Sequence, residues 1–177
     1  LLTRSSDSRV LCYLCLLLSH AVWNHPAGQR LFGDRLTLQQ LLSFLAAPRL
    51  PCAQAEAVPG AAAEGGREAL VLYALMALVN LTYNNPEVQH LVRELSGIPL
   101  VQQQLSSAAY DVRRSASFCL GNLVKDNDGN ACVLVSSGGL ERLLLCLNDE
   151  DEDELSKTAY STICQLGEPG LAKLLEL

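Results

Sequence analysis

The stretch that decides the fold is ALMALVNLTYNNPEVQHLVRELSGIPLVQQQL, residues 74–105, because the chain repeats its pattern further on. Residues 116–147, ASFCLGNLVKDNDGNACVLVSSGGLERLLLCL, align with it without a gap at an offset of 42. Apolar positions coincide in the two stretches, as do the glycines at 97 and 139. A helical pattern that recurs at this period is typical of α-solenoids, in which each unit buries its apolar face against the next.

The same register extends in both directions along the chain. Residues 155–167, LSKTAYSTICQLG, continue it at an offset of 43, and residues 14–45 match 74–105 at an offset of 60. The surplus before residue 74 is an insertion at 48–66, which is rich in Ala, Pro and Gly and is expected to be a flexible loop. We therefore expect residues 1–177 to form a single helical domain of three to four repeats. Because the first residue is Leu rather than Met, we also expect a fragment of a longer chain.

Each unit is predicted to hold three helices. A short first helix follows an Asn or Asp boundary, a second begins after Gly97 or Gly139, and a long third one closes the unit. Both glycines are expected to end the first helix in a left-handed conformation. Three helices per unit and a Gly before the second resemble armadillo repeats rather than HEAT repeats. The resemblance implies an all-α, right-handed armadillo-type solenoid.

The alignment also predicts which apolar side chains are buried between units. Stacked helices should bury equivalent leucines, each contributing on the order of 2 kcal/mol. The residues expected in this core are Leu78, Leu81, Leu120, Leu123, Ile163 and Leu166.

Composition narrows the classes of function. Apolar residues make up 49% of the chain and the net charge is −6, which argues against nucleic-acid binding. The apolar run at 10–18 is too short to span a bilayer, so no membrane insertion is expected. Seven cysteines, an odd number and mostly within apolar helical runs, favour a reducing compartment, so an intracellular protein of the nucleus or cytoplasm.

Three motifs could carry chemistry, and each has a structural explanation that we prefer. Gly138-Gly139 lacks the Lys-Ser/Thr of a phosphate loop. Cys12 and Cys15 lie in an apolar run with no second ligand pair, so core packing is expected rather than zinc binding. The acidic segment 148–156 lacks the pattern of a calcium loop and is expected to be solvated. We expect no cofactor, no metal and no enzymatic activity.

The candidate binding residues are amides in the third helices. Asn80 and Asn122 each precede a core Leu, and this pattern resembles the asparagine ladder of the importin-α and β-catenin families, which hold extended peptides. An amide donates and accepts, so it can pair with a peptide backbone. The resemblance implies a protein partner, with His20 and Gln165 on the outer rungs and Met76 and Phe118 where importins carry Trp. The alternative is that the amides only bond neighbouring helices.

A narrower resemblance concerns the last unit. The run from Cys119 to Ile163, with ELSKTAY at 154–160, looks like the closing armadillo unit of the telomere repeats-binding bouquet formation protein 1 family. That resemblance implies a nuclear scaffold for meiotic attachment of telomeres to the nuclear envelope. The other reading is a structural or regulatory segment of a larger adaptor, transport or signalling protein.

Overall fold

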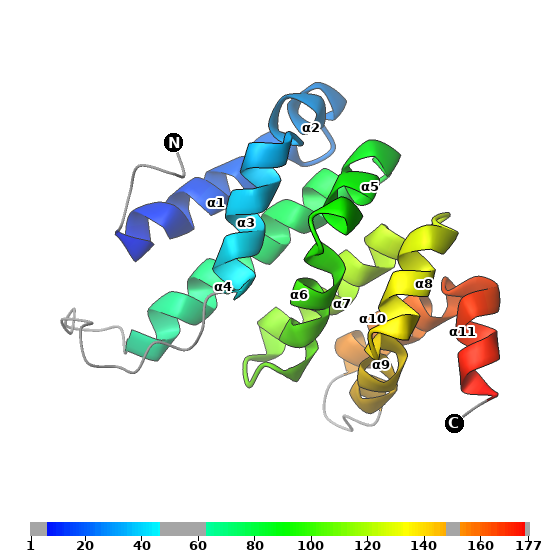
Figure 1. Ribbon diagram of the computed structural model, residues 1–177. Helices are drawn as coiled ribbons and strands as arrows, with labels where there is room; N and C mark the ends of the chain where they lie inside the picture. The colour runs from blue at the N-terminus through cyan, green and yellow to red at the C-terminus, as the bar shows by residue number, and fades with distance from the viewer. Residues whose placement is uncertain (1–6, 47–62, 148–152, 176–177) are drawn as a thin grey trace. The chain divides into compact units, whose positions relative to one another are not determined.

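The computed structural model describes residues 7–46, 63–147 and 153–175, and every regular element in these ranges is a helix (Figure 1). They form two compact units, Leu1–Leu81 and Thr82–Leu177. The helices are α1 (Ser8–Val22), α2 (Pro26–Phe32), α3 (Arg35–Ala46), α4 (Ala63–Thr82), α5 (Pro86–Glu94), α6 (Gly97–Gln103), the 3₁₀ turn η1 (Gln104–Ser106), α7 (Tyr110–Val124), α8 (Asp128–Ser136), α9 (Gly139–Leu147), α10 (Asp153–Cys164) and α11 (Gly167–Leu174).

The three-helix pattern expected from the sequence is confirmed in these elements. In unit 2, first, second and third helices follow one another as α5, α6 and α7, and again as α8, α9 and α10. The predicted insertion at 48–66 lies mostly outside the described residues, and its last four positions belong to α4. Most of the acidic segment, 148–152, also lies outside them.

A left-handed residue marks each junction between a third helix and the next first helix. Asn24, Asn84 and Asp126 have φ angles of 50, 49 and 53°. Asn and Asp tolerate this conformation better than other non-glycine residues, because their short polar side chains bond locally. The predicted boundary role of Asn and Asp is confirmed.

The residue after each junction caps the helix that follows. Each of these side chains accepts a hydrogen bond from a backbone N–H in the first turn, which satisfies a donor that the helix itself leaves without a partner. The capping residues are His25 for α2, Asn85 for α5 and Asn127 for α8.

The prediction that Gly97 and Gly139 take the left-handed conformation is wrong by one position. The left-handed residues are Ser96 (φ 54°) and Gly138 (φ 81°), and Gly97 and Gly139 are the first residues of α6 and α9. Gly139 is needed for another reason. A Cβ there would lie 2.1 Å from Cδ1 of Leu134 and 2.7 Å from its carbonyl oxygen. The glycine therefore lets the start of α9 lie against α8.

The third helices carry the core that the alignment predicts. Leu78 and Leu81 are fully buried in α4, as are Leu120 and Leu123 in α7. Leu166 is 1% exposed, whereas Ile163 on α10 is only half-buried, so its prediction is wrong. No further third helix follows α10 within the described residues to cover its outer side.

The two cysteines of the Cys-x-x-Cys pair are core residues of unit 1. Cys15 is fully buried and Cys12 is 9% exposed. Burial, with a smaller effect of the neighbouring Cys12, raises the pKa of the Cys15 thiol to about 12. Both are free thiols, and the preference for core packing is confirmed.

Candidate partner-binding surface

An exposed aromatic side chain lies beside an amide on α7. Phe118 is 50% exposed, although it belongs to a helix whose flanking residues Ser117 and Cys119 are buried. Asn122 follows one turn later and is half-buried. Residues four apart share one side of a helix, so Phe118 and Asn122 lie on the same open side of α7.

Helix α10 lies against α7 and continues this surface. The Thr162 hydroxyl donates to the carbonyl oxygen of Ser117 at 3.2 Å. A Cβ on Gly121 would lie 2.9 Å from Thr162 Oγ1 and 4.0 Å from Gln165 Oε1. The absent side chain at Gly121 thus brings the Gln165 amide close to α7. Gln165 in turn donates to Ser161 Oγ at 3.4 Å.

We call Phe118, Asn122, Ser161 and Gln165 the α7–α10 strip. Six residues were expected from the sequence to bind a partner. The three that lie in unit 2 all belong to this strip: Phe118, Asn122 and Gln165. The strip combines an aromatic ring with amide and hydroxyl groups, which suits binding of an extended segment and supplies no nucleophile–base pair.

Matching ion pairs flank the strip on both helices. Arg114 lies 3.8 Å from Asp111 on α7, and Lys157 lies 3.4 Å from Glu154 on α10. The two pairs occupy equivalent positions at the offset of 43. Such exposed pairs add little stability, so their value at a binding surface is in steering and specificity.

The other three candidates belong to unit 1. His20 is exposed and Met76 is half-buried. Asn80 is engaged with α1, because its Nδ2 donates to the Ser19 carbonyl at 3.0 Å and to the Ser19 hydroxyl at 2.9 Å. For Asn80, the geometry favours the interhelix bonding that the sequence left open as an alternative.

Two buried glutamines of the first helices were missed by sequence reasoning. Gln29 Nε2 donates to the carbonyl of Asn80 at 2.8 Å. Gln89 Nε2 donates to the carbonyls of Thr82 at 3.1 Å and Asn122 at 2.9 Å. Both satisfy carbonyls in the last turn of a third helix, which otherwise lack partners. The sequence did contain a signal for this role, because Gln29 and Gln89 occupy equivalent positions at the offset of 60.

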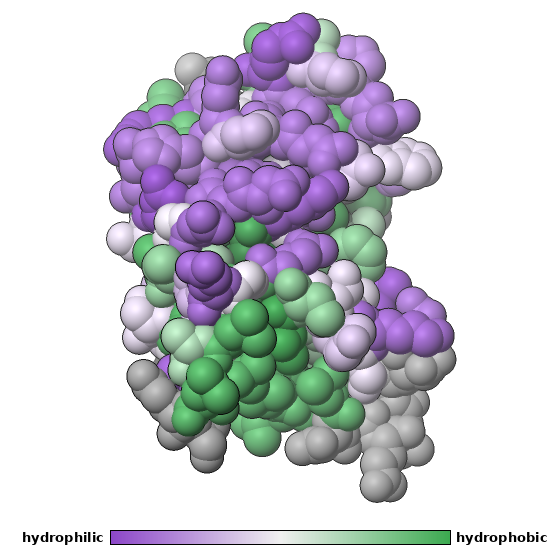
Figure 2. Space-filling view, turned by 90° about the vertical axis from the view of Figure 1, so that its right-hand side faces the viewer, coloured by the Kyte–Doolittle hydropathy of each residue, from purple (hydrophilic) through white to green (hydrophobic). Residues whose placement is uncertain are grey.

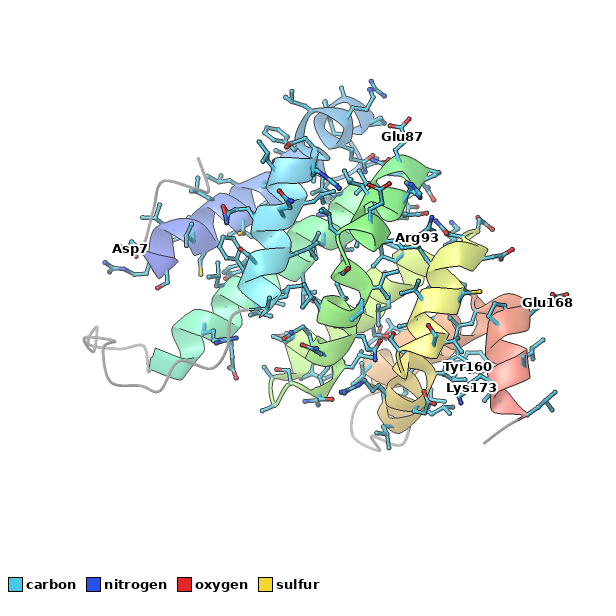
Figure 3. All side chains as sticks on the ribbon, viewed as in Figure 1. Asp7, Glu87, Arg93, Tyr160, Glu168 and Lys173 are labelled. Carbon is cyan, nitrogen blue, oxygen red and sulfur yellow. The ribbon has the colours of Figure 1, made fainter. Side chains whose placement is uncertain are left out.

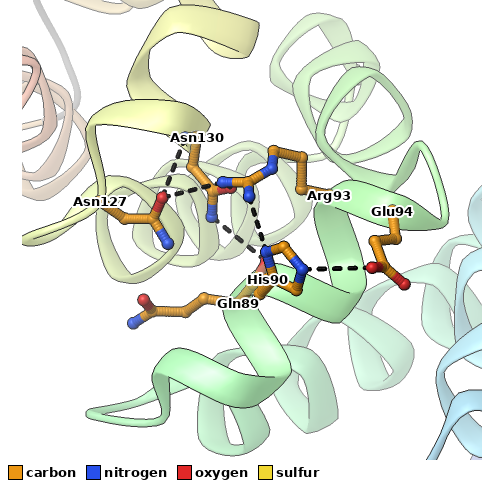
Figure 4. Close-up of polar contacts among 6 residues, drawn as sticks. All are labelled: Gln89, His90, Arg93, Glu94, Asn127 and Asn130. Atoms are coloured by element: carbon orange, nitrogen blue, oxygen red, sulfur yellow. Dashed lines mark hydrogen bonds and ion pairs between the residues drawn. The ribbon is translucent and has the colours of Figure 1, made fainter.

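A polar network joins α5 to the N-terminus of α8 (Figure 4). Arg93 Nη1 donates to Asn127 Oδ1 at 3.1 Å and to the Oδ1 of fully buried Asn130 at 2.9 Å. Arg93 Nη2 lies 2.6 Å from His90 Nδ1, and His90 Nε2 lies 3.1 Å from Glu94. Since arginine only donates, His90 Nδ1 accepts. Arg93 therefore fastens two repeats rather than facing a ligand.

A shallow pocket of about 220 Å³ lies where α5 begins and α7 ends. Its lining consists of Asn84, Pro86, Gln89, Lys125 and Asp126, and Lys125 Nζ donates to Asn84 Oδ1 at 3.2 Å across it. The lining holds one cation and one anion, so its polarity selects neither sign of charge.

Apolar residues also gather on the face of unit 2 that carries α11 (Figure 2). Lys173 of α11, labelled in Figure 3, lies 3.9 Å from Glu141 of α9. The exposed large apolar residues here are Leu145 of α9, Leu171 and Leu174 of α11, and Leu175 directly after α11.

Within 7–46, 63–147 and 153–175, no three His, Cys, Asp or Glu side chains gather as a metal site. In those ranges no single helix is long and apolar enough to cross a membrane. The pair α8 and α9 has the length and composition for a span only when taken together, and it bends by 81°.

No family model matches the chain, and sequence comparison finds an importin subunit and plakophilin-3 as relatives. Importin subunit alpha-1b of Oryza sativa subsp. japonica is 31% identical over 90 residues, which is 51% of this chain and 17% of that protein. Plakophilin-3 of Homo sapiens is 30% identical over 84 residues, 48% of this chain and 10% of that protein. The matches therefore span less than a fifth of either relative.

Structure comparison covers the chain more fully. A designed armadillo repeat protein superposes with a TM-score of 0.80 at 19% identity, covering 99% of this chain and 67% of the other. A second designed armadillo repeat protein, in complex with the peptide (KR)4, gives 0.78 at 19% identity, covering 99% and 66%. The all-α armadillo-type fold is confirmed.

Proposed function

We propose that this chain is a non-enzymatic scaffold that binds an extended segment of a partner protein along the α7–α10 strip. The observation that carries the proposal is the half-exposed Phe118 ring on the same side of α7 as Asn122, with the Gln165 amide of α10 close to Gly121. An aromatic side chain that is exposed within an otherwise well-packed helix is costly to leave in water and is a common anchor of protein interfaces.

The chemistry of the strip suits a peptide backbone. The amide groups of Asn122 and Gln165 can each donate to a carbonyl and accept from an N–H, whatever side chains the peptide carries. Phe118 supplies the apolar contact that such polar contacts lack. The peptide complex of a structurally similar designed protein supports this mode of binding.

The candidates of unit 1 are proposed as a separate contact surface of that unit. His20 is exposed and Met76 is partly exposed on the equivalent helices, so both are available to a partner. Asn80 is proposed to act mainly as a tie between α1 and α4, because Ser19 already occupies its donor group.

A second candidate is that the chain is a structural or regulatory part of a larger adaptor, transport or signalling protein. It is favoured by the small share of the importin subunit and of plakophilin-3 that the chain matches. For either role we propose a location inside the cell, in the nucleus or cytoplasm. The meiotic telomere role rests on the resemblance of residues 119–163 alone and gains no support from these relatives.

The test is selection of a random twelve-residue peptide display library on the immobilised chain. We expect enriched peptides whose affinity falls about tenfold in Phe118→Ala, as for an interface anchor, and falls also in Asn122→Ala. Leu145→Ala is the matched control, because Leu145 is exposed in the same unit but lies on α9. Absence of enriched peptides, or equal affinity for the wild type and Phe118→Ala, would overturn the proposal.

A further inference from the structure

Helix α2 is capped by a titratable ring, whereas the equivalent helices are capped by amides. His25 Nδ1 accepts the N–H of Gly28 at 2.8 Å. At the same position of the next repeats, Asn85 Oδ1 accepts at 3.3 Å and Asn127 Oδ1 at 3.1 Å. Of these three caps, only that of α2 can change its charge near neutral pH.

The geometry fixes the protonation state that the cap needs. A backbone N–H only donates, so Nδ1 of His25 must carry the lone pair and the ring must be neutral. A proton added at Nδ1 would turn the acceptor into a donor that faces another donor. It would also place a positive charge at the positive end of the helix dipole. Both effects weaken the cap when the ring is protonated.

We propose that His25 makes α2 a pH-sensitive joint of unit 1. At neutral pH the cap is formed and α2 is held at its N-terminus. As the pH falls through the range in which histidine takes up a proton, the cap is lost and α2 loosens. Helix α8, capped by Asn127, keeps its cap over the same range.

Loosening of α2 would reach the third helix of the next repeat. Gly28 lies so close to α1 that a Cβ there would be 2.7 Å from the Ala21 carbonyl oxygen. Gln29 follows it and donates to the Asn80 carbonyl at the end of α4, at 2.8 Å. Movement of α2 therefore weakens a hydrogen bond that satisfies the last turn of α4.

The surroundings of His25 do not supply a compensating charge. The described titratable and charged groups of the elements around it are Arg9, Cys12, Tyr13, Cys15 and His20 on α1, Arg30 on α2, Asp34 and Arg35 at the start of α3, and Arg67, Glu68 and Tyr73 on α4. None of these described groups forms an ion pair with the His25 ring. His20 is the other histidine among these groups, so it is the control.

The experiment is amide hydrogen exchange of the whole chain at pH 7.5 and pH 5.5, each corrected for the intrinsic exchange rate. We expect protection of residues 26–32 to fall about fivefold at pH 5.5, as for the loss of one N-cap, and that of 128–136 to change less than twofold. His25→Asn, which installs the cap of the other repeats, should abolish the fall. His20→Asn should leave it unchanged.

Two results would overturn the proposal. One is equal protection of α2 at both pH values in the wild type, and the other is the same fall in His25→Asn. If His25→Asn does not fold, nitrogen NMR of the wild-type ring decides. Nδ1 should be without a proton at pH 7.5, and a ring protonated at Nδ1 at that pH would contradict the cap itself.

Discussion

Asn80 on α4 donates two hydrogen bonds to one residue of α1, the carbonyl and the hydroxyl of Ser19. The two residues are 61 positions apart in the chain, so the amide acts as a long-range tie within unit 1. The same amide occupies a rung of the ladder that the sequence pattern predicts for partner binding.

We therefore expect Asn80→Ala to lower the free energy of unfolding by about 1–2 kcal/mol, because the Ser19 groups lose a buried donor. Urea unfolding measures the effect. Ser19→Ala should cost less, since it removes only one of the two bonds, and the double variant should cost less than the sum. Gln39→Ala on the exposed side of α3 is the control. If Asn80→Ala is as stable as the wild type, Asn80 does not act as a tie to Ser19 and is again a candidate for partner binding.

Gly139→Ala should be strongly destabilising. Its Cβ would lie 2.1 Å from the Leu134 side chain, and overpacking of this kind costs about 1–3 kcal/mol or more. Gly66→Ala is the matched comparison, because nothing lies within 4 Å of a Cβ at that helical position. It should be neutral or stabilising by up to about 1 kcal/mol. Thermal unfolding of both variants checks the contrast, and similar melting temperatures would contradict it.

Asp34 should make unit 1 less stable in acid. Partial burial opposes its ionisation, but hydrogen bonds from the Thr37 hydroxyl and from the amides of Thr37 and Leu36 outweigh burial and lower the pKa of Asp34. A lowered folded-state pKa contributes stability that is complete above the unfolded pKa near 4 and is lost as the pH falls through the folded value.

The comparison is urea unfolding of the wild type and of Asp34→Asn between pH 7 and pH 3. Asn keeps a capping oxygen but does not titrate. The stability difference between the two proteins should shrink on acidification, by no more than about 1 kcal/mol because Asp34 is exposed. A constant difference across this range would show that the charge contributes nothing.

Thiol labelling should separate the cysteines by burial. Burial raises the pKa of the Cys119 thiol to about 12, and burial together with Cys12 does the same for Cys15. Cys132 and Cys164 are exposed. A maleimide at pH 7 should therefore label Cys132 and Cys164 first, as mass spectrometry would show, and the other described cysteines only after unfolding. In the Cys132→Ser, Cys164→Ser variant, rapid labelling of Cys15 or Cys119 would contradict the packing.

The repeat fold followed from periodicity because periodicity reports which side of a helix is buried. Equivalent leucines at a fixed offset had to lie in equivalent places, and Leu78 and Leu120 are both fully buried. Ile163 is an exception, because it is only half-buried. Its burial depends on which helix packs against α10, and the repeat offset does not contain that information.

Partners of polar side chains were harder to predict, because they depend on distances between helices. The alignment marks Asn80 as a candidate binding residue, yet its amide donates to Ser19 on the preceding third helix. The glycines were misassigned for a related reason. The sequence pattern shows that a glycine is needed, but it does not show whether a left-handed backbone angle or a close contact requires it. At Gly139 the reason is the close contact with Leu134.

The short junctions at Asn24, Asn84 and Asp126 have one further consequence. Each junction connects a third helix to the next first helix through the same few residues. The offsets of 42, 43 and 60 show that the repeats differ in length instead in the connection between the second and third helices. These differences in length lie at 48–66 and in the acidic segment. An epitope tag or a fused domain belongs in these connections, because a single added residue at Asn24, Asn84 or Asp126 would shift the capping residue that follows it.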